Sequence, residues 1–177
     1  MTAWDPLGPF QPGSGGMPPY LAGREAEQGL FRALLARLRD RGSLPAEVIL
    51  YGPRGNGKTV LLRWLRNQAA VLDPIETAVL RPNGIPDVIR LAELLLPRKW
   101  WDRLTPEQVA GFGFSLRPGT KGGPPPAPED ILELRARKAP LLIVMDEAHT
   151  LDLVVGRTLL NACQEVRQDL PLLLVPS

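Results

Sequence analysis

Eight consecutive residues, 52–59, constrain the fold of this chain more than any other part of its sequence. They read Gly-Pro-Arg-Gly-Asn-Gly-Lys-Thr and match a pattern in which two glycines bracket four residues and are followed by Lys and Ser or Thr. The apolar run at residues 48–51 precedes them and predicts a short buried strand. Residues 60–66 continue without Gly or Pro, as a helix does. A strand, a glycine-rich turn and a helix in this order are typical of a phosphate-binding loop.

The residue types in this stretch suit a nucleotide phosphate chain. The glycines let the backbone turn so that consecutive N–H groups face one concavity, at the positive end of the helix that begins near Lys58. Lys58 can neutralise β- and γ-phosphate charge, and the Thr59 hydroxyl can ligate Mg²⁺. The predicted phosphate-binding residues are Gly52, Pro53, Arg54, Gly55, Asn56, Gly57, Lys58 and Thr59. The alternative is a glycine-rich turn that binds nothing.

Length and composition are those of one globular domain. The chain has 177 residues, of which 44% are apolar and 23% charged, and its net charge of +2 is too small to indicate nucleic-acid binding. The single cysteine, Cys163, has no partner in the chain for a disulfide and is expected to be buried. No apolar run is long enough for a membrane span and no signal peptide is visible, so we expect a cytoplasmic protein without membrane contact.

The order of patterns along the chain predicts an α/β fold. Residues 1–19 are rich in Pro and Gly and are expected to form a flexible tail, followed by a core over residues 20–177 that opens with a leucine-rich amphipathic helix. Further apolar strands are expected at residues 77–80, 141–145 and 170–175, with helices between them. Strands that alternate with helices predict a parallel sheet covered on both faces, a three-layer sandwich.

Two other segments carry no specific chemical signal. Trp100 and Trp101 adjoin basic residues and could stack on single-stranded nucleic acid, although packing of a loop onto the core is favoured. Residues 111–128 contain many glycines and prolines and are expected to form an inserted loop, functional or disordered.

The second half of the predicted site follows the strand at residues 141–145, which leads directly into Asp-Glu-Ala-His at 146–149. In parallel sheets, ligands bind at the carboxyl ends of the strands. Asp146 is expected to hold Mg²⁺ and Glu147 to activate the attacking water. The alternative is that both acids stabilise the start of the next helix. His149 could sense the γ-phosphate or be an ordinary polar residue, and a lone histidine does not indicate zinc.

These residues resemble the AAA+ class of P-loop ATPases, and within it the branch of origin-recognition and transposition-helper ATPases. The likeness rests on Gly-Arg-Glu at residues 23–25 with its leucine-rich helix, on residues 52–59 and on residues 146–149, and it spans about residues 20–175. It implies that the adenine lies near the segment of Leu21, Ala22, Gly23 and Arg24. It also implies that Lys58 and Thr59 contact the phosphates and Mg²⁺. Asp146 and Glu147 would have the roles given above.

The resemblance further implies a sheet order of 5-1-4-3-2 with a lid domain. The sequence given ends at Ser177, where a polar sensor residue is expected at or just past the fourth strand, and before a fifth strand, an arginine finger or a lid arginine. We therefore expect four strands in the order 1-4-3-2 and the amino-terminal part of a longer ATPase.

The leading hypothesis is a core that binds ATP and Mg²⁺, with Lys58 and Glu147 as catalytic residues and hydrolysis that is weak or depends on a partner. A second is an interaction module whose shape is set by nucleotide without hydrolysis. A third is a fragment of a helicase of the Asp-Glu-Ala-His class, which the Gly-Arg-Glu helix argues against. Self-association is expected because the strand at residues 48–51 would lie at an open edge of the sheet. A DNA or protein partner is left open.

Overall fold

A parallel sheet of three strands forms the middle layer of the protein in its computed structural model, which describes residues 21–42, 44, 48–96 and 127–177. The strands are β1 (Glu76–Leu80), β2 (Leu141–Met145) and β3 (Leu172–Pro176), in the order β1-β2-β3. Glu76 pairs with Leu141, and Leu141 pairs with Leu172, so the three strands start level with one another. The predicted tail, the tryptophan pair and the loop at residues 111–128 up to residue 126 lie outside the described residues.

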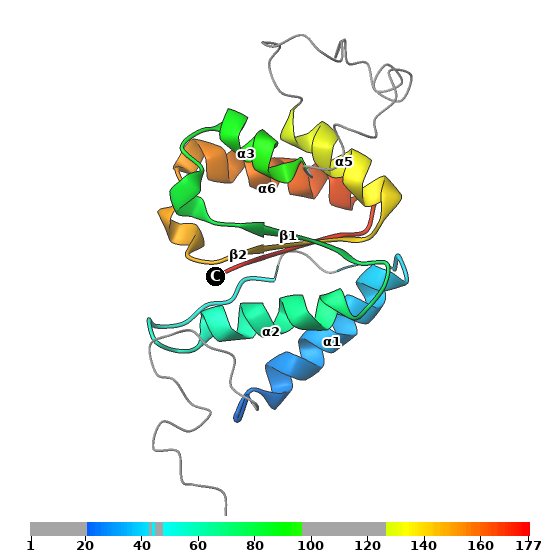
Figure 1. Ribbon diagram of the computed structural model, residues 1–177, viewed down its shortest axis with the longest axis vertical. Helices are drawn as coiled ribbons and strands as arrows, with labels where there is room; N and C mark the ends of the chain where they lie inside the picture. The colour runs from blue at the N-terminus through cyan, green and yellow to red at the C-terminus, as the bar shows by residue number, and fades with distance from the viewer. Residues whose placement is uncertain (1–20, 43, 45–47, 97–126) are drawn as a thin grey trace, which may run out of the picture.

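Helices cover both faces of the sheet (Figure 1). On one face lie α1 (Glu25–Arg39) and α2 (Lys58–Ala70), and on the other lie α3 (Val88–Leu95), α5 (Pro128–Lys138) and α6 (Leu153–Arg167). Short 3₁₀ turns follow two of the strands, η1 (Pro82–Gly84) after β1 and η2 (Ala148–Thr150) after β2. This arrangement confirms the predicted α/β class with a parallel sheet. Among the described residues, no helix is both long and apolar enough to cross a membrane.

The sheet divides the hydrophobic core into two clusters because alternate side chains of a strand point to opposite faces. Leu141 and Ile143 of β2 belong to the cluster under α3, α5 and α6, which includes the buried Cys163. Leu142 and Val144 of the same strand belong to the cluster under α1 and α2. The first cluster is the larger of the two, and it alone takes buried side chains from β1.

One predicted strand is not a strand in the structure. Residues 48–51 lie beside β3, where the Leu50 N–H donates to the Pro176 carbonyl at 2.9 Å, but they form no ladder. Pro176 has no N–H, so at the position where its carbonyl accepts from Leu50 it cannot also donate to this segment. Ile49 and Tyr51 are 67% and 97% exposed. Three strands therefore replace the four expected, although their mutual order agrees with the corresponding part of the predicted order.

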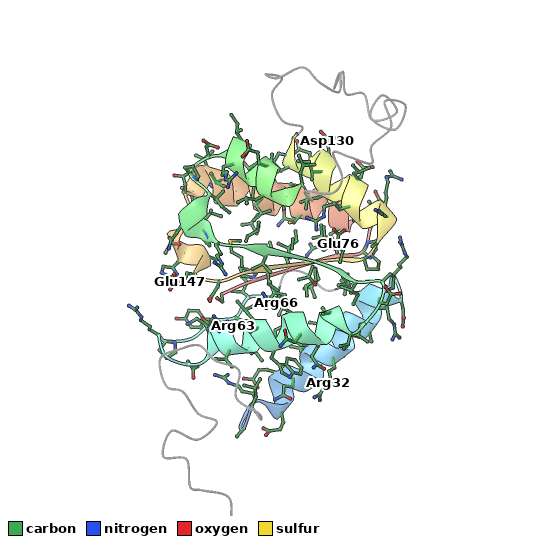
Figure 2. The ribbon with its side chains drawn as sticks, in the orientation of Figure 1. Arg32, Arg63, Arg66, Glu76, Asp130 and Glu147 are labelled. Atoms are coloured by element: carbon green, nitrogen blue, oxygen red, sulfur yellow. The ribbon has the colours of Figure 1, made fainter. Side chains whose placement is uncertain are left out.

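A buried arginine ties three elements together at the end of the sheet where the strands begin. The Arg135 guanidinium, on α5, donates to the Leu95 carbonyl of α3 at 2.7 Å and to Glu76 Oε1 of β1 at 2.9 Å. The Arg135 side chain is 5% exposed and that of Glu76 is 29% exposed. Figure 2 shows Glu76 and Glu147 at opposite ends of the sheet, so this ion pair lies away from the predicted catalytic residue and serves the fold.

Candidate phosphate-binding site

The glycine-rich loop connects residues 48–51 to the first turn of α2. Gly57 is the N-cap of α2 and has a φ of 72°, in the left-handed region that disfavours residues with a Cβ. Gly52 has a φ of 155°, a backbone conformation that residues with a Cβ rarely adopt, and a Cβ there would also require the Asn56 amide, 2.9 Å away, to shift. The backbone angles of the loop therefore favour glycine at both positions.

Lys58 begins α2 and its side chain folds back over the loop. Its Nζ donates to the carbonyl of Gly52 at 2.8 Å and to that of Pro53 at 3.1 Å. These contacts hold a positive charge beside the helix N-terminus, where the helix dipole is also positive. The combination is unfavourable by itself and becomes favourable when an anion binds, which is why it suits a phosphate.

The N-terminus of α2 differs from the N-termini of the other described α-helices. It has no side-chain cap and no acidic residue in its first turn. The other described α-helices carry an acidic residue at the N-cap or in the first turn: Glu25 and Glu27 in α1, Asp87 in α3, Glu129 and Asp130 in α5, and Asp152 in α6. The first N–H groups of an α-helix have no partner within the helix. In α2 no side-chain cap accepts from these N–H groups, and Thr59 lies in this same turn.

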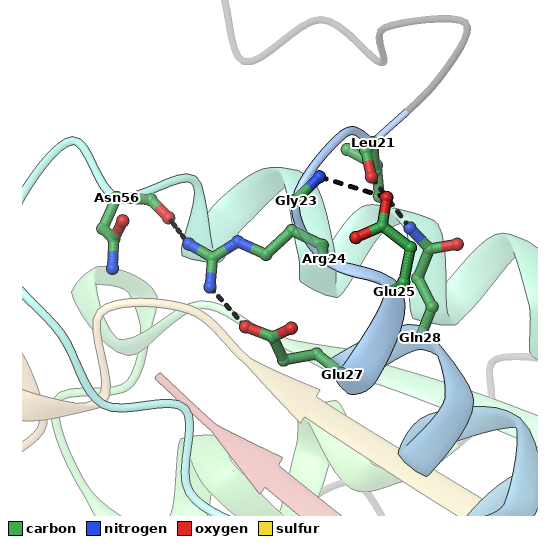
Figure 3. Close-up of polar contacts among 7 residues, drawn as sticks. All are labelled: Leu21, Gly23, Arg24, Glu25, Glu27, Gln28 and Asn56. Atoms are coloured by element: carbon green, nitrogen blue, oxygen red, sulfur yellow. Dashed lines mark hydrogen bonds and ion pairs between the residues drawn. The ribbon is translucent and has the colours of Figure 1, made fainter.

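The segment before α1 contacts the loop through one residue. Arg24, the N-cap of α1, donates through Nη2 to the Asn56 carbonyl and through Nη1 to Glu27 Oε1, the latter at 2.6 Å (Figure 3). The hydrogen bond from Arg24 holds the pKa of the Glu27 carboxyl below its usual range. Arg24 therefore joins the predicted adenine-side segment to the predicted phosphate loop.

A pocket of about 290 Å³ opens between α1, the segment at residues 48–51 and the start of α2. Phe31 and Leu61 line its apolar part, and Glu27, Asn56 and Lys58 supply polar groups. Of the four residues predicted to lie near the adenine, Arg24 lines this pocket, whereas Leu21, Ala22 and Gly23 are not among its lining residues.

The acidic residues lie directly after β2, as predicted, and Glu147 has an unusual backbone. Its φ of 56° and ψ of 42° place it in the left-handed region, which costs a residue with a Cβ about 1 kcal/mol or more. Neighbouring contacts hold this conformation, because the carbonyl of Glu147 accepts both the N–H and the hydroxyl of Thr150 at 2.9 Å. His149 lies in the 3₁₀ turn η2 and is exposed.

Ser177 contacts Asp146 of the predicted site, at a position where the sequence predicted only a polar residue at or just past the strand end. Its Oγ donates to Asp146 Oδ1 at 2.8 Å, its N–H donates to the Met145 carbonyl at 2.9 Å, and its own carbonyl accepts from the Ala148 N–H at 2.8 Å. A polar residue directly after a buried apolar strand is the signal that identifies it. Asp146 Oδ1 also accepts from the Glu147 N–H at 3.1 Å, so both of these hydrogen bonds use one carboxylate oxygen.

The two halves of the predicted site lie at the same end of the sheet. Figure 1 shows the first turn of α2, the turn after β2 and the C-terminus together at the carboxyl ends of the strands. Thr59 and Asp146 are hard oxygen donors of the kind that Mg²⁺ prefers. In the part of the chain that the structure describes, no group of three or more His, Cys, Asp or Glu side chains forms a metal cluster. The roles assigned to the individual site residues stay predictions.

Comparisons with known proteins agree with the fold. No protein-family model matches the sequence, and no curated protein matches it either. Among solved structures, the chain is similar to the ORC1 protein of Aeropyrum pernix, which was solved in complex with DNA, with a TM-score of 0.53 and 24% sequence identity. The match covers 89% of this chain and 39% of the ORC1 chain, so the chain spans about two fifths of that protein. The likeness shows that these residues share the fold of the matched part of the ORC1 protein.

Proposed function

We propose that this chain is a nucleotide-binding core of the AAA+ type that binds ATP together with Mg²⁺. The observation that carries the proposal is the N-terminus of α2, which has Lys58 folded over the preceding loop and no acidic side chain in its first turn. An electropositive helix N-terminus behind a glycine-rich loop binds phosphate groups through its N–H groups and its dipole. The acidic pair after β2 adds a carboxylate for Mg²⁺ and a carboxylate that can activate water, both of which hydrolysis of a nucleoside triphosphate requires.

Each residue then has a defined task. Lys58 neutralises charge on the β- and γ-phosphates, and Glu147 orients and deprotonates the attacking water. Thr59 and Asp146 would hold Mg²⁺, which supplies charge neutralisation at the phosphates when bound. Ser177 fixes Asp146 by donating to Oδ1, so that Oδ2 remains for the cation or its water.

The base of the nucleotide would occupy the pocket between α1 and residues 48–51. Its apolar walls suit a flat aromatic ring, and it adjoins Lys58 and therefore the phosphates. Nucleotide in this position would also order residues 48–51, which already make one backbone hydrogen bond to β3. These residues would then occupy the position of the fourth strand, in the order 1-4-3-2, without the one hydrogen bond that Pro176 cannot donate.

Replacing Glu147 with glutamine should preserve ATP binding and abolish hydrolysis. Glutamine keeps the size of the side chain but cannot accept a proton from water, whereas the phosphate contacts do not involve this residue. We expect the Kd for ATP, measured by titration calorimetry with Mg²⁺, to stay within about threefold of the wild-type value. Phosphate release should fall to the background rate.

The matched control is Glu93→Gln, which removes a carboxylate of the same kind from an exposed position on α3. It should hydrolyse ATP at the wild-type rate. Turnover by the isolated wild-type chain is expected to be slow, well below the ~10 s⁻¹ typical of enzymes. A Glu147→Gln protein that hydrolyses as fast as the wild type would mean that the catalytic residue lies elsewhere. Wild-type protein that binds ATP but releases no phosphate would support the interaction module instead.

The segment at residues 48–51 is expected to mediate self-association of the isolated protein. Ile49 and Tyr51 expose apolar surface beside a backbone that makes one hydrogen bond to β3, and charged side chains on such a segment oppose pairing with another chain. Light scattering should show a mass that rises with concentration, and Ile49→Lys should reduce this rise. Val71→Lys, at a 77% exposed site after α2, is the control and should leave it unchanged. A concentration-independent monomer would show that this segment is covered.

Whether the chain has a DNA partner, which the sequence leaves open, is a question for experiment. The ORC1 protein in the comparison was solved with DNA, but the chain spans 39% of that protein. A protein partner and the helicase alternative likewise remain for experiment.

A further inference from the structure

Arg24 joins two segments that are far apart in the sequence. Its Nη2 donates to the carbonyl of Asn56, 32 residues away, and its Nη1 donates to Glu27 Oε1 at 2.6 Å (Figure 3). The guanidinium thus uses its fork geometry to hold a carboxylate on α1 and a backbone oxygen in the loop at the same time. A contact to the backbone is independent of the side chain at position 56, so it acts on the conformation of the loop.

The peptide bond between Asn56 and Gly57 is the unit that this contact orients. A trans peptide is planar, and its C=O and N–H point in opposite directions. A donor that holds the Asn56 carbonyl from outside the loop therefore turns the Gly57 N–H toward the inside. Gly57 is the N-cap of α2, and a φ of 72° lets it adopt this orientation without strain.

We infer that Arg24 is a positioning residue that aims the Gly57 N–H at the phosphate concavity. This assignment differs from the role near the adenine that the family resemblance implies for residues 21–24. It rests on the proposed function, because it needs a phosphate group in the loop. Its effect is to set one phosphate-binding N–H before the ligand arrives, so that binding does not have to order the peptide.

Contacts of α1 and of the segment before it hold the backbone at Arg24 in place. Gln28 Nε2 donates to the Leu21 carbonyl at 3.0 Å and Glu25 Oε1 accepts from the Gly23 N–H at 3.2 Å, so the segment before α1 is tied to the helix. The helix is anchored in turn by buried residues that include Phe31 and Leu35. The Asn56 N–H donates to the Pro53 carbonyl at 3.3 Å within the loop, while Arg24 adds a contact from outside it.

The test compares two ligands that share the phosphates and differ in the base. Binding of Mg-ATP and of Mg-tripolyphosphate is measured by titration calorimetry for the wild type and for Arg24→Gln. A misdirected N–H weakens a hydrogen bond to a charged group, so both affinities should fall by the same factor, about tenfold to a hundredfold. Arg24→Lys can donate to the Asn56 carbonyl but cannot hold Glu27 with a fork, so it should restore part of the loss.

The orientation of the same peptide bond can be followed by NMR in the protein without ligand. The amide resonance of Gly57 in the ligand-free protein should move in Arg24→Gln and stay in place in Arg37→Gln, which removes the same charge from an exposed position in the last turn of α1. Arg37→Gln should also leave both affinities within about twofold of the wild type.

Each outcome decides a separate question. A loss for ATP with unchanged tripolyphosphate binding would overturn the inference and assign Arg24 to the base. Unchanged binding of both ligands, or an unmoved Gly57 resonance, would overturn it as well. A wild-type protein that binds neither ligand would contradict the proposed function itself, and the Gly57 resonance would still report whether Arg24 orients the peptide.

Discussion

Replacing Lys58 with alanine should remove most of the thermal stabilisation that Mg-ATP gives to the wild-type protein. A ligand that binds the folded state alone, at one hundred times its Kd, stabilises that state by about 2.7 kcal/mol. For a domain of this size this corresponds to a rise in melting temperature of roughly 5 to 10 °C. The variant lacks the charge that balances the phosphates, so at the same ATP concentration we expect a rise of at most 1 or 2 °C by differential scanning fluorimetry.

Two comparisons make this result specific. Without ligand, the variant should melt within a few degrees of the wild type, because the contacts of Lys58 to Gly52 and Pro53 lie in a largely exposed loop. Arg66→Ala removes a positive charge from an exposed position on the same helix and should keep the full ATP-dependent rise. Equal rises for the wild type and Lys58→Ala would mean that ATP binds elsewhere or through other groups.

The largest loss of stability is expected from Arg135→Ala. The substitution leaves the Glu76 carboxylate without its ion-pair partner in a partly buried position and the Leu95 carbonyl without its buried donor. Removing one member of a buried ion pair typically costs about 3 kcal/mol or more. With a urea dependence of about 2 kcal/mol per molar, the unfolding midpoint should fall by about 1.5 M.

The matched control is Arg137→Ala, two residues further along α5. Arg137 pairs with Glu133 at the surface, one helical turn away, and exposed pairs of this kind contribute about 0.5 kcal/mol or less. A double variant, Arg135→Met with Glu76→Leu, removes both charges and should be more stable than Arg135→Ala, because no unpaired carboxylate remains. An Arg135→Ala protein as stable as Arg137→Ala would show that the buried pair does not hold these elements together.

The sequence predicted those parts of the site that depend on neighbouring residues. Lys58 and Thr59 lie in the first turn of a helix after a glycine-rich loop, and Asp146 and Glu147 lie after a fully buried strand, because local patterns determine both positions. The predicted strand at residues 48–51 is wrong for this structure because a strand needs a ladder with its neighbour, and Pro176 lacks one of the donors.

Contacts between segments that are distant in the sequence could not be predicted, because local sequence patterns do not specify them. The hydrogen bond of Arg24 to the Asn56 carbonyl requires the start of α1 to lie against the loop, which no local pattern specifies. The same holds for Arg135, whose spacing on α5 does not reveal that it faces β1 and the end of α3. Ser177 reaches Asp146 because β3 lies next to β2 and brings its hydroxyl to that carboxylate.

The two halves of the predicted site lie on layers that pack over different clusters of the hydrophobic core. Lys58 and Thr59 are carried by the layer over the smaller cluster, whereas Asp146 and Glu147 begin the connection to α6 over the larger one. Regions with less buried apolar contact open locally at lower free energy than the rest of a fold. Local opening of the α1–α2 layer would therefore separate phosphate-binding groups from acidic groups while the other layer stays folded. A ligand that contacts both groups would link the two layers. Its binding energy would raise the protection of the backbone amides in the α1–α2 layer against hydrogen exchange.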